Sequence, residues 1–143
     1  MERRRPRQPP TRPLVLFADG HDDTRDLYVA ALTSFGFEIT TVSEGADAFA
    51  RAWQTHPDII VTEVLFPGFD GWDFIRNVTR DPRTRDIPVV IVTSDDKAAA
   101  RERATREGCA AFLVKPCVPD RLATELRTAL YQAPVHVHAS TSR

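Results

Sequence analysis

The strongest constraint on this chain is the repeated alternation of a short apolar run with a segment of helical spacing. Five strand-like runs occur, at residues 14–18, 37–42, 59–61, 87–92 and 110–114, and each is too short to be a buried helix. No hairpin turn separates one run from the next. Consecutive strands joined by helices must pair in parallel through right-handed crossovers. We therefore predict an α/β fold, a three-layer, doubly wound open parallel sheet.

The helical segments predicted between these runs have local start and stop signals. We expect Asp22 or Asp23 in the first turn or at the N-cap of the first helix, and Gly36 at its end. The second helix, residues 46–55, is predicted to bury Phe49, Ala50 and Trp53. Three more helices are expected near residues 70–79, 96–107 and 119–131. Asp96 is predicted to be the N-cap of the second of these three.

Composition divides the 143 residues into one domain, residues 14–131, and two short flanks. Residues 1–13 hold five arginines, four prolines and one glutamate, which predicts a disordered basic arm. A tether to nucleic acid or anionic lipid is the alternative interpretation, but short charged runs are usually only solvated, so we expect no nucleic-acid partner. Residues 132–143 are predicted to be a flexible tail, in which His136 and His138 are too few for a metal site.

The chain carries no signal for secretion or for a membrane. No apolar run approaches the roughly 18 residues that cross a bilayer, and the N-terminus lacks the apolar segment of a secretory signal. Cys109 and Cys117 have no zinc-ligand spacing and form no disulfide framework. We therefore expect a cytoplasmic protein with no membrane contact.

Four of the five predicted strands end in a chemically capable side chain. Asp19, Glu63, Thr93 and Lys115 follow the first, third, fourth and fifth strands. Because the carboxyl ends of parallel strands share one edge of the sheet, these residues should meet in one crevice. Carboxylates can bind a hard divalent cation, while a hydroxyl and a lysine can contact a phosphoryl oxygen. The set suits the binding or transfer of a phosphoryl group.

These motifs resemble the receiver domain of bacterial response regulators in two-component signalling, over about residues 14–131. The resemblance rests on residues 14–24, on residues 57–71 with their Leu-Phe-Pro-Gly-Phe-Asp-Gly loop, on residues 89–93, and on Phe-Leu-Val-Lys-Pro at 112–116. It implies a flavodoxin-like (βα)5 sheet of strand order 2-1-3-4-5. The family also implies that the Lys115–Pro116 bond is often cis.

The resemblance assigns a role to each residue at the strand ends. Glu63 stands at the phosphoacceptor position, Thr93 and Phe112 match the switch pair, and Lys115 matches the family lysine. Asp19, Glu63 and the backbone carbonyl of Leu65 match the Mg²⁺ site.

Two departures from the family pattern fall on the same reaction. Gly20 replaces the second residue of the usual acidic pair, so one Mg²⁺ ligand is missing and the site should be weak or absent. Glu63 replaces aspartate and adds a methylene, about 1.5 Å of reach. Misplacing a nucleophile by about 1 Å can cost about a hundredfold in rate. We therefore expect impaired phosphotransfer and no enzyme activity.

Two questions stay open at the level of sequence. Asp22 is a substitute for the missing ligand, or, as we favour, only an acidic residue in the first helical turn. Glu63 either imitates the phosphorylated state and biases Thr93 and Phe112, or it is an unused carboxylate paired with Lys115.

The leading hypothesis is a stand-alone, phosphorylation-independent receiver, since only residues 132–143 follow the last predicted helix. Its partner would be a histidine kinase, a downstream signalling protein or a second copy. The face formed by the fifth strand and its flanking helices would bind that partner, and it offers Ala98, Ala99, Ala100, Arg101, Arg103, Arg121 and Arg127.

Two other functions compete with this hypothesis. In the first, the chain is a functional receiver that accepts a phosphoryl group from a histidine kinase on Glu63. In the second, it is an unrelated doubly wound protein that binds a nucleotide or flavin. The acidic segment 19–23 argues against the second, because it would repel phosphate where a glycine-rich loop would bind it.

Overall fold

Five parallel strands form the central sheet of the computed structural model, which describes residues 3–6, 11–132 and 134–137. The strands are β2 (Leu14–Ala18), β3 (Glu38–Val42), β4 (Ile59–Thr62), β7 (Val89–Thr93) and β8 (Ala111–Val114). Their spatial order is β3-β2-β4-β7-β8, with every pair parallel. Numbered along the chain, this is the predicted order 2-1-3-4-5, so the predicted fold is confirmed.

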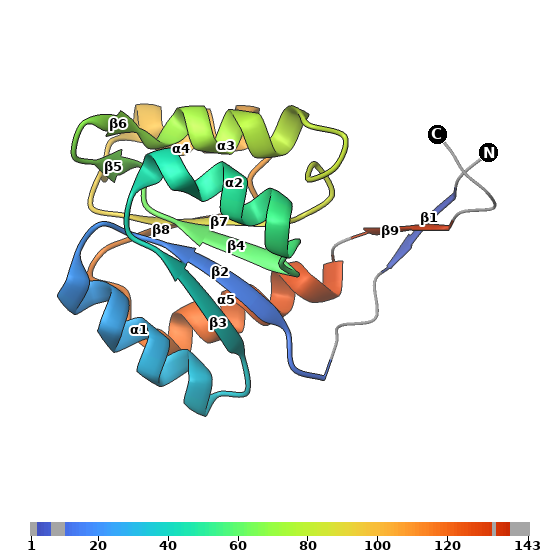
Figure 1. The fold of residues 1–143 in the computed structure, drawn as a ribbon, viewed down its shortest axis with the longest axis horizontal. Coiled ribbons are helices and arrows are strands. Elements are labelled where there is room, and N and C mark those ends of the chain that lie inside the picture. The colour runs from blue at the N-terminus through green and yellow to red at the C-terminus, as the bar shows by residue number, and fades with distance from the viewer. Residues whose placement is uncertain (1–2, 7–10, 133, 138–143) are drawn as a thin grey trace.

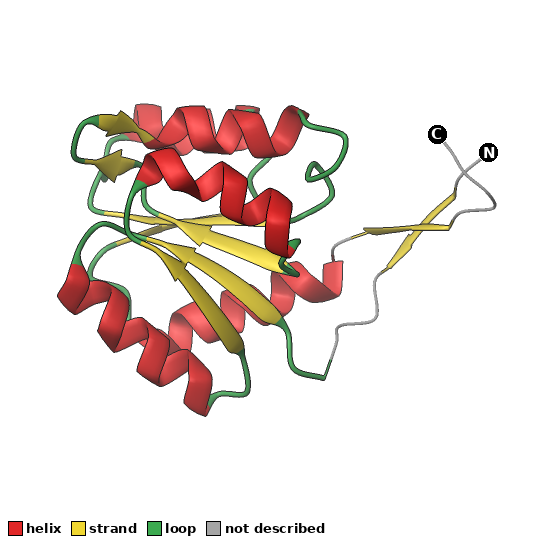
Figure 2. Cartoon of the chain, viewed as in Figure 1, coloured by secondary structure: helices red, strands yellow, loops and turns green. Residues whose placement is uncertain are grey.

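Helices cover both faces of the sheet (Figures 1 and 2). Helices α2 (Gly45–Thr55), α3 (Gly71–Arg80) and α4 (Ala98–Arg106) lie on one face, and α1 (Asp22–Ser34) and α5 (Pro119–Gln132) lie on the other. Successive side chains along each strand point to opposite faces of the sheet and pack into two separate hydrophobic cores. In β2, Leu16 and Ala18 pack toward α2–α4, whereas Val15 and Phe17 pack toward α1 and α5.

The local signals for the helices were partly correct. Asp22 and Asp23 lie in the first turn of α1, and the side chain of Asp70 caps α3 by accepting a hydrogen bond from the Trp72 N–H at 2.9 Å. The predicted cap at Asp96 is wrong, because Lys97 is the N-cap of α4 and makes no side-chain cap.

The apolar face predicted for α2 is wrong in part. The helix buries Ala48 and Ala52, whereas Phe49 is half-buried against the same core, Ala50 is exposed, and Trp53 is 48% exposed. The close packing of α2 against the sheet leaves room for alanines, and the larger aromatic side chains lie at the edge of the contact.

The absence of hairpins predicted from the sequence is a further error. The loop after β4 forms a small hairpin of β5 (Leu65–Phe66) and β6 (Phe69–Asp70), turned at Gly68 with φ of +68°. Near the termini, β1 (Arg3–Pro6) pairs antiparallel with β9 (Pro134–Val137), away from the central sheet (Figure 1).

Strands β1 and β9 fall in segments assigned to the arm and the tail, and the domain limits 14–131 stay a prediction. His136 lies within β9, while His138 lies outside the described residues. Within the described ranges, no helix combines the length and apolar character needed to cross a bilayer.

Candidate functional site: the carboxyl rim of the sheet

The carboxyl ends of the central strands bring the predicted residues to one rim. Asp19 follows β2, Glu63 follows β4, and Thr93 ends β7; all three are at most 2% exposed. Lys115 follows β8, and its side chain is 16% exposed. Parallel pairing therefore places an acid from each of two neighbouring strands beside a lysine from the edge strand.

Lys115 joins the two acids. Its Nζ lies 2.8 Å from Asp19 Oδ2, to which it donates a hydrogen bond, and 3.0 Å from Glu63 Oε2. Burial alone would lower the pKa of Lys115, but the contacts with both acids and their negative charges outweigh burial and raise this pKa above its ordinary 10.5. The peptide bond between Lys115 and Pro116 is cis.

The carboxylate of Glu63 is turned back onto its own loop. Oε1 accepts hydrogen bonds from the backbone N–H groups of Val64 and Leu65, at 2.8 and 3.1 Å. Oε2 is in ionic contact with Lys115 but accepts no hydrogen bond from the described residues. The added methylene thus permits a tight local turn of the side chain, and both oxygens already have a partner.

The loop after β2 is arranged around Asp19. Its Oδ1 accepts a hydrogen bond from the His21 N–H at 2.8 Å and lies 3.2 Å from His21 Nδ1. Arg25, one turn into α1, donates to the backbone carbonyl of Asp19 at 2.9 Å and pairs with Asp22 at 2.6 Å. Asp22 is therefore a mostly exposed residue of the first helical turn whose charge is already compensated.

A side chain at position 20 would fit this loop. A Cβ built on Gly20 would lie no closer than 3.4 Å to any neighbouring atom, the nearest being the carbonyl oxygen of Ser43. Packing therefore does not require glycine there, and the position tolerates a larger residue.

The two residues matched to the family switch have separate surroundings. The hydroxyl of Thr93 accepts a hydrogen bond from the Asp95 N–H at 3.1 Å, and among the described residues no hydrogen bond joins it to Glu63. Phe112 on β8 is half-buried, and the guanidinium of Arg101 on α4 lies 4.8 Å from its ring centroid. Arg101 Nη1 also donates to the Phe112 carbonyl at 3.4 Å.

Sequence reasoning did not find Arg25, His21 or the role of Arg101 at the rim. Helical spacing could have suggested Arg25, since an arginine three residues after Asp22 on a helix can pair with it. No local signal marks the contact of Arg101 with Phe112, which are eleven residues apart in different elements.

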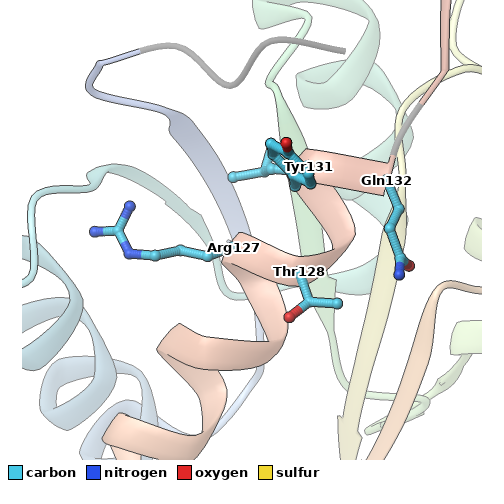
Figure 3. A pocket seen from close by; sticks show the side chains of 5 residues that line it. Arg127, Thr128, Tyr131 and Gln132 are labelled. Carbon is cyan, nitrogen blue, oxygen red and sulfur yellow. The ribbon is translucent and has the colours of Figure 1, made fainter. Parts of the chain in front are cut away.

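Other candidate groups lie away from the rim. A cavity of about 390 Å³ beside the last turns of α5 is lined by Arg127, Thr128, Leu130, Tyr131 and Gln132 (Figure 3). Burial raises the pKa of Cys109 to about 12, which makes its thiol unreactive. No cluster of three or more His, Cys, Asp or Glu suited to a metal occurs among residues 3–6, 11–132 and 134–137.

Comparisons with known proteins agree with the fold. The family model of the response regulator receiver domain matches residues 15–127. Protein PilH of Pseudomonas aeruginosa is 30% identical over 118 residues, which cover 81% of this chain and 96% of PilH. Response regulator PleD of Caulobacter vibrioides is 37% identical over 102 residues, which cover 71% of this chain but 22% of PleD. This chain thus matches only about a fifth of PleD.

The structural comparison gives the same result. The chemotaxis response regulator CheY4 of Vibrio cholerae has a TM-score of 0.76 and 25% identity, and the match covers 83% of this chain and 99% of that one. The resemblance drawn from the motifs is confirmed, and the roles of individual rim residues stay predictions. With a family match across most of its length and a receiver-like sheet, the chain belongs to the response regulator receiver domains.

Proposed function

We propose that this chain is a receiver module that signals through protein contacts without taking up a phosphoryl group. The observation that carries this proposal is the bridge from Lys115 to both Asp19 and Glu63. The ammonium group of Lys115 neutralises the charge of the two neighbouring carboxylates, so a side chain of the protein itself provides the cation at this site. Localisation in the cytoplasm, the absence of enzyme activity, and a kinase or downstream protein as partner are parts of the same proposal.

The nucleophile would have to leave several contacts before it could react. Glu63 Oε1 accepts two backbone hydrogen bonds, and Oε2 faces the ammonium group of Lys115. An attacking carboxylate oxygen must be aligned with the incoming phosphorus, and a misplacement of about 1 Å can cost about a hundredfold in rate. The folded-back position of this side chain opposes such alignment.

The residues present fit Mg²⁺ poorly. Position 20 supplies no ligand, and the two remaining carboxylates, Asp19 and Glu63, already share the Lys115 ammonium. Arg25 adds a second cation through its hydrogen bond to the Asp19 carbonyl. Mg²⁺ requires near-ideal octahedral geometry from oxygen ligands, and Lys115 already contacts one carboxylate oxygen of each acid, while Arg25 only adds positive charge nearby. We therefore propose that this rim binds Mg²⁺ weakly or not at all.

Intact-mass spectrometry after incubation with acetyl phosphate and Mg²⁺ tests the proposal. The unaltered chain should gain no mass, and the variant Gly20→Asp/Glu63→Asp should gain about 80 Da, one phosphoryl group. A mass gain on Glu63 of the unaltered chain would establish the competing function, a phosphate-accepting receiver. If neither protein gains mass, our assignment of the two disabling positions is wrong.

The contacts also favour a silent Glu63 over a mimic of phosphate. Thr93 accepts its hydrogen bond from Asp95, whereas a mimic should engage the Thr93 hydroxyl. Replacing Glu63 with Gln removes the charge and keeps the shape. Between the unaltered chain and Glu63→Gln, changes in amide NMR chemical shift should be confined to residues near Asp19, Glu63 and Lys115. Chemical-shift changes that extend to Phe112 and α4 would show that Glu63 biases the switch.

A further inference from the structure

The two ends of the chain join in one element outside the central sheet. Strand β1 (Arg3–Pro6) pairs antiparallel with β9 (Pro134–Val137), and the register places Arg4 opposite His136. In Figure 1 this terminal ribbon lies beyond the end of α5, on the side of the molecule opposite the β5–β6 hairpin. Since that hairpin lies at the carboxyl rim, the ribbon stands on the side of the amino ends of the strands, clear of the rim.

Charge is divided unevenly between the segments that form this ribbon and the rest of the chain. Residues 1–13 and 132–143 together hold six arginines and one glutamate, whereas residues 14–131 hold 13 basic and 19 acidic residues. The two flanks thus carry a formal charge of +5, and the domain between them carries −6. A polyanion is therefore attracted to the flanks and repelled by the domain.

The ribbon contains basic positions and no acidic one. Its strands read Arg-Arg-Arg-Pro and Pro-Val-His-Val, without an aspartate or a glutamate. Successive residues of a strand belong to opposite faces, so three consecutive arginines place basic positions on both faces of the ribbon. Arg12, which is exposed on the link to β2, adds a fourth basic position. Pairing with β9 fixes the spacing of the arginines, which an unpaired arm would have to order on binding.

This set of positions suits the phosphodiester groups of duplex DNA. A guanidinium group is planar and always charged, and it can donate two parallel hydrogen bonds to the oxygens of one phosphate. A two-stranded ribbon also fits the major groove of B-DNA, which is about 12 Å wide. A lipid surface attracts the same charges, but lasting attachment requires a second, apolar signal. Besides proline, Val135 and Val137 are the only apolar residues of the ribbon.

We propose that the terminal ribbon of β1 and β9 binds duplex DNA through its phosphates, independently of base sequence. The four basic positions that contact phosphates are Arg3, Arg4, Arg5 and Arg12. Composition alone predicted a solvated arm without a nucleic-acid partner, and the pairing of the arm with the tail is the observation that changes this expectation. The inference goes beyond the proposed function and is independent of it, because no residue of the carboxyl rim takes part.

Fluorescence anisotropy of a labelled duplex of about 20 base pairs, titrated with the full chain, tests the proposal. With four phosphate contacts, the logarithm of the association constant should fall with log[NaCl] at a slope of about −3.6, which is about a hundredfold loss of affinity between 50 and 200 mM. Arg3→Gln/Arg4→Gln/Arg5→Gln should reduce this slope to about −0.9, the value for one remaining contact. Two duplexes of unrelated sequence should bind within about twofold of each other, since phosphate contacts carry no sequence information.

Two further variants separate the ribbon from net charge and from an unpaired arm. Arg76→Gln/Lys97→Gln/Arg106→Gln removes three charges outside the ribbon, from α3, α4 and the N-cap of α4, and should leave the salt slope unchanged. Val135→Pro/His136→Pro keeps every arginine. Because adjacent N–H groups of a strand point to opposite sides, it removes an N–H that faces β1, and it should weaken binding about three- to tenfold, the cost of ordering one or two free side chains.

Several results would overturn the inference. No binding at 50 mM NaCl would do so, as would a slope that changes equally in the ribbon variant and in the variant of α3 and α4. Unchanged binding by Val135→Pro/His136→Pro would make the arm an unpaired tether. Binding to anionic vesicles but not to the duplex would assign the ribbon to a membrane. Self-association that the three arginine substitutions abolish, again without duplex binding, would assign it to the acidic domain of a second copy.

Discussion

At the scale of residues, one lysine at the carboxyl rim of the sheet pairs with two acids. Lys115 is the common partner of Asp19 and Glu63, and all three side chains are largely shielded from water. Buried carboxylates are costly without a cation, so removing the lysine leaves two of them uncompensated.

Lys115→Met should therefore destabilise the fold by about 3 kcal/mol, the range measured when one partner of a buried pair is removed. Lys97→Met is the matched control, because the side chain of Lys97 is 78% exposed and 3.7 Å from Asp95; it should change stability by less than about 0.5 kcal/mol. Urea unfolding at pH 7 measures both. Equal effects of the two variants would contradict the central role of Lys115.

The raised pKa of Lys115 gives the same pair a dependence on pH. The folded state holds this proton more tightly than the unfolded state, so the stabilisation is complete below the ordinary pKa of 10.5 and is lost as pH rises through the higher folded value. The stability deficit of Lys115→Met should be constant between pH 7 and about 10 and should narrow above it. If the stability difference between the unaltered chain and Lys115→Met already narrows between pH 7 and 9, a titratable group other than Lys115 would be responsible.

At the scale of elements, close backbone contacts place the loop after β4 on the rim. A Cβ on Gly71, the first residue of α3, would lie 2.5 Å from Val64 Cα and 2.6 Å from the Val64 carbonyl oxygen. Backbone atoms cannot move aside as a flexible side chain can. Glycine at position 71 therefore holds the start of α3 against the residue that follows Glu63.

Gly71→Ala should lower the free energy of unfolding by about 1–3 kcal/mol through this overpacking. Gly20→Ala serves as its control, since its Cβ would make only ordinary contacts of 3.4 Å or more, and it should leave stability within about 0.5 kcal/mol. Thermal unfolding of both variants measures the difference. A larger loss in Gly20→Ala would mean that the loop after β2 is the tighter of the two.

At the scale of the whole molecule, a ligand that binds only the folded state raises its stability by mass action. If Mg²⁺ does not bind the rim, 10 mM Mg²⁺ should leave the Tm of the unaltered chain unchanged. In Gly20→Asp/Glu63→Asp, a Kd near 1 mM would add about 1.4 kcal/mol, which raises Tm by about 3–5 °C for a domain of this size. Differential scanning calorimetry with Ca²⁺ as a parallel cation provides the measurement. A rise in the unaltered chain would show that the site still binds metal.

Much of the fold was predictable because it depends on local pattern. Residues 14–18 form a strand with the predicted limits, and the residues that follow the strands converge because parallel pairing puts all carboxyl ends together. The buried face of α2 was not predictable in the same way. Periodicity alone favoured Phe49 and Trp53, but the packing distance to the sheet selected Ala48 and Ala52.

By itself, the sequence determined the parallel sheet, the four chemically capable residues at its rim, and the presence of a glycine at position 20 and a glutamate at position 63, because each follows from short-range pattern or residue identity. Tertiary structure alone decided that one ammonium group serves two acids and that Arg101 covers Phe112. Lys115 and Asp19 are 96 residues apart, so their contact depends on how the strands are ordered and how each side chain turns at the rim. Strand order and side-chain orientation depend on packing and charge in three dimensions, so no local stretch of the sequence predicts this contact.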